Sequence, residues 1–336
     1  MGLMLYTALL SFALALCTGF VSIPMLTRLK FGQRVRNDGP KTHIKKTGTP
    51  TMGGVIFLIP LIIVSLIFSA GDWGFIPTAV LVTLGFALIG FADDLLKVVL
   101  KRSLGLKAKY KLIGQISLAV IFAFYAYTHP DIGSQIVLPF VQFEWDLGIW
   151  YVPFVAFVVV ATTNSVNLTD GLDGLAAGVS FVVAVTFAVL ASIYAYLAEQ
   201  GNLNHMVLNN EGMAIFSTAL AGAVLGFLRY NFFPAKVFMG DTGSMGLGGA
   251  IVAIAVLLRL PLFLPVMGGI YMLETLSVIV QVIYFKFTGK RILRMSPLHH
   301  HFELSGMSEN KVVASFTFAS VILCLIGFFG VLATTL

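Results

Sequence analysis

Two adjacent carboxylates and a lysine, in the segment Phe91-Ala-Asp93-Asp94-Leu-Leu-Lys97, are the residues of this chain best suited to chemistry. On a helix, Lys97 lies four residues after Asp93 and three after Asp94, so its ammonium group can reach either carboxylate. The triple ends an apolar run over residues 75–91. Because a charge in hydrocarbon costs about 2.5 to 3.5 kcal/mol and a Leu or Phe returns only about 0.5, we expect the triple where a membrane helix meets water.

The composition is that of a polytopic membrane protein. Hydrophobic residues make up 58% of the 336 residues and charged residues 11%, whereas soluble proteins carry about 25% charged residues. This balance excludes a soluble enzyme, and we expect no nucleic-acid partner.

Ten apolar runs approach or exceed the roughly 17 to 25 residues that a bilayer-spanning helix needs. They cover residues 3–26, 52–68, 75–91, 112–127, 150–163, 175–197, 213–228, 245–260, 262–287 and 312–336. The run 262–287 is longer than a bilayer requires and contains Pro265 and Gly268-Gly269, so it should tilt, bend or break. We predict an all-α fold of about ten transmembrane helices, forming one integral membrane domain over residues 1–336. Between the fourth and fifth runs, residues 135–144 are expected to form a short hairpin on the membrane surface.

The basic residues predict the orientation of these helices. All but one of the 21 Lys and Arg residues fall in the connections between an odd-numbered span and the next even-numbered one, and Arg259 alone lies on the other side. By the positive-inside rule those connections are cytoplasmic, and an even number of spans places both termini outside. The basic face would attract anionic lipids or an anionic substrate, although setting the topology is sufficient reason for most of these lysines.

The connection between the fifth and sixth spans carries four polar residues at intervals of three: Asn164, Asn167, Asp170 and Asp173. On a helix or helical turn this spacing lines one face, so amides and carboxylates would be offered to one ligand. Helix capping would explain one of the two aspartates but not the whole series. We therefore interpret the series as a binding site.

A fifth aspartate, Asp241, follows Phe238-Met-Gly240 and precedes a row of small residues. Asp241 could simply cap the helix that begins there. It could equally be a metal ligand beside backbone N–H groups that suit a phosphate. The presence of Asp93 and Asp94 on the same membrane face favours the metal.

Two further inner segments contain basic residues. His299, His300 and His301 are consecutive, so on a helix their side chains would point about 100° apart and could not share one metal; phosphate contact or loop ordering is expected. The first inner loop, from His43 through Lys46 to Gly54, is either a phosphate contact or a turn into the membrane. Glu274, inside the ninth span, is by default functional, but a neutral Glu bonded to a neighbouring helix is an equal alternative, and we do not assign it to the site.

Carboxylates, lysines and histidines at the cytoplasmic ends of membrane helices suit phosphoryl transfer with Mg²⁺, because carboxylates hold the metal that neutralises the phosphates. From the position of these residues at the membrane surface we also infer that one substrate is soluble and that the other is a lipid phosphate.

These motifs resemble the polyprenyl-phosphate N-acetylhexosamine-1-phosphate transferases over nearly the whole chain. They are Asp93-Asp94-Leu-Leu-Lys97, residues 164–174, Phe238-Met-Gly-Asp241 and Pro297-Leu-His-His-His301-Phe-Glu. The last of them, with Lys45-Lys46-Thr-Gly-Thr-Pro-Thr-Met-Gly-Gly54, is similar to the branch that uses phospho-MurNAc-pentapeptide. The resemblance implies Mg²⁺-dependent transfer of that group from its UDP carrier to undecaprenyl phosphate in the bacterial inner membrane. The products would be lipid I, a peptidoglycan precursor, and UMP. The resemblance also implies a homodimer.

The resemblance assigns roles to residues. Asp241 would hold Mg²⁺, while Asp93 and Asp94 would act on the lipid phosphate. Lys97 and Lys109 would neutralise phosphates, with Lys111 competing for the second role. The substrate-binding residues would be Lys46, Asn164, Asn167, Asp170, Gly171, Asp173, Asn231, Phe238 and the three histidines His299, His300 and His301. Whether Asp93 attacks the β-phosphate or deprotonates the lipid phosphate stays open, since both schemes need a carboxylate there.

Two alternatives remain at this point. A sister enzyme using UDP-GlcNAc would have the same chemistry. A secondary transporter would also fit ten spans and a broken helix, but transporters place their polar groups near the midplane of the membrane. The carboxylates of this chain gather at helix ends instead.

Overall fold

A computed structural model describes residues 2–29, 46, 48–69, 73–100 and 105–335. His43 and Lys45 lie outside the described residues. The helices are α1 (Gly2–Arg28), α2 (Val55–Phe68), α3 (Ile76–Val99), α4 (Ala108–Thr128), α5 (Tyr151–Thr169), α6 (Leu175–Gln200), α7 (Asn204–Asn231), α8 (Gly240–Leu257), α9 (Leu264–Met267), α10 (Gly269–Thr288), α11 (Leu298–Leu304) and α12 (Glu309–Thr335).

The prediction of an all-α membrane protein is confirmed in its coarse form. Within the described residues, nine helices are long and apolar enough to cross a membrane: α1, α3, α4, α5, α6, α7, α8, α10 and α12. The second predicted span corresponds to α2, which is apolar but has only 14 residues. Counting α2, nine of the ten predicted spans each correspond to one described helix, and the ninth span is divided.

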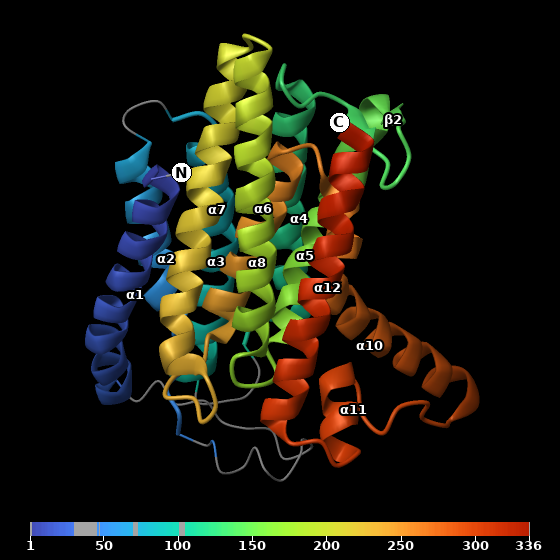
Figure 1. Ribbon diagram of the computed structural model, residues 1–336. Helices are drawn as coiled ribbons and strands as arrows, with labels where there is room; N and C mark the ends of the chain where they lie inside the picture. The colour runs from blue at the N-terminus through green and yellow to red at the C-terminus, as the bar shows by residue number, and fades with distance from the viewer. Residues whose placement is uncertain (1, 30–45, 47, 70–72, 101–104, 336) are drawn as a thin grey trace.

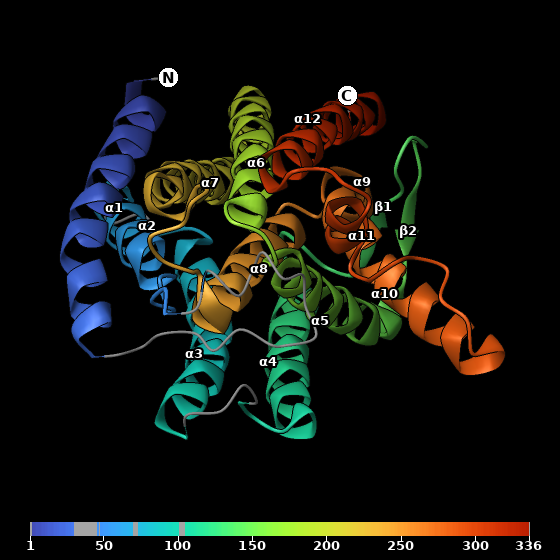
Figure 2. The ribbon, with the colours of Figure 1, turned by 90° about the horizontal axis from the view of Figure 1, so that it is seen from below.

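Helix α8 forms the centre of the bundle, between α3, α5, α6 and α7 (Figure 2). Every residue of α8 from Thr242 to Leu257 is buried. This follows from its sequence, which is apolar or small on all sides, as expected for a helix that has protein neighbours on every face. The N-terminal end of α8, where Asp241 lies, is therefore fixed by several neighbours at once.

The long ninth run is broken, as predicted. It divides into a short 3₁₀ turn at Pro261–Phe263, helix α9 and helix α10, with Gly268 between the two helices. Figure 1 shows α10 leaning away from the other helices. Many apolar side chains of α10 are exposed, among them Val282, Ile283 and Phe285.

The predicted surface hairpin is also present. Strands β1 (Gln135–Val137) and β2 (Glu144–Asp146) pair antiparallel, with Ile136 opposite Trp145. The hairpin and both chain ends lie at the same end of the bundle (Figure 1). Arg259, the one basic residue predicted on this side, donates to Glu144 of the hairpin at 3.1 Å.

Candidate active site

The three carboxylates singled out from the sequence come together at the opposite end of the bundle. Asp93 and Asp94 are near the C-terminal end of α3, Asp241 is in the first turn of α8, and each offers an oxygen within 4.8 Å of the others. The two helices approach closely at Gly90, where an added Cβ would lie 2.0 Å from the carbonyl oxygen of Asp241. Asp93 and Asp94 are buried, with 3% and 2% of their surface exposed. Like charges this close require cations beside them.

Two lysines supply positive charge to the cluster. The Nζ of Lys97 lies 2.6 Å from Asp93 Oδ2, 3.1 Å from Asp241 Oδ2 and 3.6 Å from Asp94 Oδ1. The Nζ of Lys111, on α4, lies 2.5 Å from Asp241 Oδ2. The predicted reach of Lys97 to both neighbouring carboxylates is thus present. Two ammonium groups thus lie among three carboxyl groups, and Asp93 and Asp241 also share a side-chain hydrogen bond.

Lys109, to which the family resemblance assigned the second phosphate-neutralising role in competition with Lys111, is not in this cluster. Its side chain is exposed and its Nζ lies 4.9 Å from the centre of the Tyr110 ring. Lys109 and Lys111 both lie on α4, and residues two apart on a helix point about 200° apart. Only one of them can face the carboxylates, and it is Lys111.

Asp94 caps helix α8 from the neighbouring helix. Its carboxylate accepts hydrogen bonds from the backbone N–H of Asp241 at 3.1 Å and from the N–H and hydroxyl of Thr242, each at 2.8 Å. Gly240 makes room for this, because its φ is +71° and an added Cβ would lie 2.6 Å from Asp94 Oδ2. The capping role that the sequence left open for Asp241 is thus filled by Asp94. The side chain of Asp241 is directed to Lys97 and Lys111 instead.

Helix α5 brings its amides to the same cluster. Asn167 Nδ2 donates to Asp241 Oδ1 at 3.1 Å and contacts Ser244 Oγ at 2.7 Å. Asn164 lies one turn earlier and exchanges hydrogen bonds with Gln115 of α4 at 2.9 and 3.3 Å. Asn167 therefore orients Asp241, whereas Asn164 joins α5 to α4.

The turn between α5 and α6 is held by Asp173 and Asn231. Asp173 accepts hydrogen bonds from Lys46 Nζ at 2.7 Å and from the Ala235 N–H at 2.9 Å. Asn231, at the end of α7, accepts the Gly174 N–H at 3.0 Å and donates to the Val237 carbonyl at 3.0 Å. Phe238 lies next in the chain, half-buried. These polar residues order the loops beside the carboxylate cluster.

The three histidines contact three different partners. His299 is buried, with its Nδ1 3.1 Å from Glu274 Oε1 and its backbone N–H donating to the same oxygen at 3.3 Å. His300 Nδ1 lies 2.9 Å from Glu303 Oε2. His301 Nδ1 accepts the Arg294 N–H at 3.1 Å. Glu274 thus bonds to a neighbouring helix, which is one of the two alternatives that the sequence left open for it.

Comparison with known proteins assigns the chain to a family. Residues 76–259 match the model of glycosyl transferase family 4, and residues 46–58 match signature 1 of phospho-N-acetylmuramoyl-pentapeptide-transferase. The phospho-N-acetylmuramoyl-pentapeptide-transferase of Thermoanaerobacter sp. (strain X514) is 52% identical over 321 residues, which is 95% of this chain and 96% of that protein. The chain belongs to the phospho-N-acetylmuramoyl-pentapeptide-transferase family.

Two further transferases of this name have similar identities. That of Clostridium novyi (strain NT) is 49% identical over 99% of this chain and 98% of its own length. That of Caldanaerobacter subterraneus subsp. tengcongensis is 51% identical over 97% of this chain and 98% of its own length. The family match at residues 76–259 begins at the start of α3 and ends just after α8, so it includes Asp93, Asp94 and Asp241.

Gly171 lies against the side chain of His299, so a larger residue at position 171 should disturb the site. A Cβ on Gly171 would lie 2.2 Å from His299 Nε2, and overpacking of this kind costs about 1 to 3 kcal/mol. We expect Gly171→Ala to displace His299 or the α5–α6 turn and to lower both the melting temperature and the catalytic rate. Gly114→Ala is the matched control, because its nearest contact would be an ordinary 3.5 Å. Equal behaviour of the two variants in thermal unfolding and activity would contradict the contact.

Asp170, at the C-terminal end of α5, holds its proton more tightly than an ordinary aspartate. Burial, together with the charges of Asp241 and Asp94, raises the pKa of its carboxyl well above the ordinary value. The folded protein then holds a proton that the unfolded chain loses near pH 3.9, so this group's contribution to folding stability is lost as the pH rises through the raised pKa. In metal-free protein, we expect Asp170→Asn to melt at a higher temperature than the parent at pH 8. The difference should shrink towards pH 4. Parallel melting curves against pH would show that the carboxyl is not perturbed.

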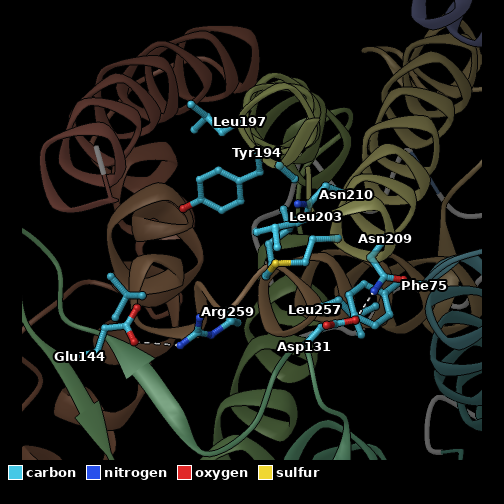
Figure 3. A pocket seen from close by; sticks show the side chains of 14 residues that line it. Phe75, Asp131, Glu144, Tyr194, Leu197, Leu203, Asn209, Asn210, Leu257 and Arg259 are labelled. Carbon is cyan, nitrogen blue, oxygen red and sulfur yellow. Dashed lines mark hydrogen bonds and ion pairs between the residues drawn. The ribbon is translucent and has the colours of Figure 1, made fainter. Parts of the chain in front are cut away.

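A pocket of about 290 Å³ lies at the other end of the bundle, near the start of α3 and the end of α8 (Figure 3). Asp131 in this pocket accepts a hydrogen bond from Asn209 Nδ2 at 2.7 Å, and Arg259 reaches Glu144. None of the predicted site residues lines it. It is distinct from the carboxylate cluster, which lies at the opposite ends of the same two helices.

Sequence reasoning passed over several residues that contact the site. Gln115, which bonds to Asn164, is one turn after Lys111 on α4, so helical spacing from Lys111 would indicate it. Glu309, in the first turn of α12, bonds to Lys46 and to the Asp173 backbone. Its position predicts only a favourable charge at a helix N-terminus, and nothing local indicates a partner 263 residues earlier in the chain.

Proposed function

We propose that this protein transfers phospho-MurNAc-pentapeptide from UDP-MurNAc-pentapeptide to undecaprenyl phosphate, forming lipid I and UMP in peptidoglycan synthesis. The observation that carries the proposal is a cluster of three carboxylates, each within 4.8 Å of the others, in a chain about half identical to transferases of this name. The identity extends over 95 to 99% of the chain in these comparisons and favours the pentapeptide substrate over UDP-GlcNAc.

The carboxylate cluster fits Mg²⁺. Carboxylate oxygens are the ligands that this hard cation prefers, usually one or two from the protein with phosphate oxygens of the substrate completing the shell. Asp241 would hold the ion, because Asn167 orients its carboxylate and the other two carboxylates each offer an oxygen within 4.8 Å of it. When bound, Mg²⁺ would neutralise charge on the diphosphate that is being broken.

Asp93 is the carboxylate best placed to act on the lipid phosphate. Asp94 has both oxygens occupied by the N-terminus of α8, so its role is mainly to position Asp241. Asp93 accepts the backbone N–H of Leu106 at 2.9 Å and is paired with Lys97. Asp93 would either take the proton from undecaprenyl phosphate or attack the β-phosphate itself, and Lys97 would stabilise the negative charge in either case.

The nucleotide would lie beside the cluster, over the α5–α6 turn. The residues assigned to the uridine are Lys46, Asn167, Asp170, Gly171, Asp173 and Phe238. Asn164 is a further substrate-binding residue, Asn231 would lie close to the metal, and His299, His300 and His301 would line the sugar-phosphate side. Lys111 takes the phosphate-neutralising role for which Lys109 was the first candidate, since Lys111 contacts Asp241. The contacts among these residues support one continuous site along α5, α8 and α11.

The protein would work as a multi-pass enzyme of the bacterial inner membrane, with its single domain covering residues 1–336. Among the described residues, the basic side chains of Lys46, Lys97 and Lys111 lie at the same end of the bundle as the carboxylate cluster. We assign this end to the cytoplasm by the positive-inside rule. Both termini would then be periplasmic. The active form would be a homodimer surrounded by membrane lipids.

Donor choice tests the proposal. Purified protein in detergent, with undecaprenyl phosphate and Mg²⁺, should release UMP from UDP-MurNAc-pentapeptide and give a lipid with the mass of lipid I. Release from UDP-GlcNAc instead would preserve the chemistry and move the protein to the sister enzymes. Folded protein that releases UMP from neither donor would refute the transferase function.

A further inference from the structure

Glu309 at the start of α12 connects two parts of the proposed nucleotide site that are far apart in the sequence. Its Oε1 accepts a hydrogen bond from Lys46 Nζ at 2.6 Å and another from the backbone N–H of Asp173 at 2.8 Å. All three side chains are largely withdrawn from solvent: 16% of the Lys46 side chain is exposed, 3% of Asp173 and 9% of Glu309. One carboxylate oxygen thus joins α12, the α5–α6 turn and the segment before α2.

The charges of this group limit what Lys46 can do. Its ammonium lies 2.7 Å from Asp173 Oδ1 and 2.6 Å from Glu309 Oε1, so two carboxylates oppose one cation. Away from bulk water such pairs are strong and hold a defined geometry. Lys46 is therefore not a free positive charge for the diphosphate. An ammonium group has three N–H donors, and two of them already have carboxylate acceptors.

Asp173 alone can bind the ammonium group of Lys46. The additional contribution of Glu309 is its hydrogen bond to the backbone N–H of Asp173. The other oxygen of Asp173 accepts the Ala235 N–H, which fixes the side chain of Asp173 towards the loop after α7. Glu309 holds the main chain of Asp173 through the hydrogen bond to its N–H. Together they determine where the α5–α6 turn lies relative to Lys46.

We propose that Glu309 is a positioning residue for the nucleotide-sugar substrate, acting through Lys46 and the Asp173 turn. The inference rests on the proposed function, because it assigns the UDP moiety to this side of the site. Glu309 does not touch the carboxylate cluster in the contacts described. Its loss should weaken binding of the soluble substrate and leave the reaction with the lipid phosphate largely intact.

The test compares Glu309→Gln and Glu309→Ala with the parent protein. Glu309→Ala removes the acceptor for both donors, and we expect its KM for UDP-MurNAc-pentapeptide and its Kd for UMP to rise about 10- to 100-fold. Glu309→Gln keeps an acceptor oxygen but loses the charge, so a smaller rise is expected. The KM for undecaprenyl phosphate should stay within about twofold in both, a separation that general destabilisation would not produce. Glu199→Gln, on an exposed residue at the other end of the bundle, is the matched control and should behave as the parent.

A double-mutant cycle adds a readout specific to the mechanism. If Glu309 acts through Lys46, the rise in KM caused by Glu309→Gln should be much smaller in a Lys46→Met background, because contacting residues are not additive. Full additivity, or an unchanged nucleotide KM and UMP affinity in both Glu309 variants of an active parent, would overturn the inference. A parent protein that releases no UMP from either donor would refute the proposed function itself, and would do so before any variant is compared.

Discussion

Asp241→Asn is expected to lower the rate of UMP release by about 10³-fold or more. A metal ion stabilises transition-state charge by several kcal/mol, each 1.36 kcal/mol corresponds to a factor of ten in rate, and Asp241 is the proposed ligand. The substitution leaves the backbone N–H of Asp241 free to donate to Asp94, so the cap on α8 remains. The loss should therefore appear in kcat and in Mn²⁺ binding measured by electron paramagnetic resonance, not in the melting temperature.

Asp146→Asn is a suitable control for this loss. Asp146 is exposed on the hairpin at the other end of the bundle, where its contacts are with Ser134 and the Gly148 N–H. We expect full activity and unchanged Mn²⁺ binding. Asp241→Asn protein that still binds Mn²⁺ as tightly as the parent would remove Asp241 from the metal site.

Asp93→Asn and Asp94→Asn are expected to differ although the two residues are adjacent. Asp93→Asn removes the proposed base or nucleophile and should lower kcat by about 10² to 10⁴-fold. Its melting temperature should change little, because the contacts of Asp93 with the Leu106 N–H, Lys97 and Asp241 do not cap a buried helix. Asp94→Asn weakens the cap of a buried helix and should cost about 0.5 to 2 kcal/mol of folding stability in addition to activity.

The melting temperatures of the two variants separate these roles. Helix α8 lies at the centre of the bundle (Figure 2), so a change at its N-terminus should be transmitted to overall stability. Equal melting temperatures for Asp93→Asn and Asp94→Asn would show that Asp94 is not the structural partner of α8. A catalytically normal Asp93→Asn variant would exclude both schemes for attack on the phosphates.

The positions of the helices were predictable from the sequence because burial in a membrane requires long apolar runs. The break near Gly268 was predictable because Pro and Gly interrupt a helix. The hairpin, predicted over residues 135–144, was predictable from the local strand pattern. The cluster of Asp93, Asp94 and Asp241 could be placed on one face from the distribution of charge. The helices, the break and the hairpin depend on features within about 20 residues of the chain, whereas the common face of the carboxylates depends on comparing the charges of all the connections.

The division of labour within the cluster was not predictable in this way. Whether Lys109 or Lys111 faces the carboxylates depends on the rotation of α4 about its own axis, which is set by its packing against α3 and α5. The capping of α8 by Asp94 depends on the close approach of two helices at Gly90. Glu309 is connected to Lys46 only through the complete fold. Each of these is a tertiary contact, and local sequence patterns carry little information on it.

Metal-dependent turnover of the parent protein tests the central claim most directly. UMP and lipid I should be quantified together from UDP-MurNAc-pentapeptide and undecaprenyl phosphate in Mg²⁺, after removal of the metal with EDTA, and after Mg²⁺ is restored. We predict equal amounts of the two products, complete loss with EDTA and recovery with Mg²⁺. Product formation that continues unchanged without a divalent cation would contradict the assignment of the carboxylate cluster as a magnesium-dependent transferase site.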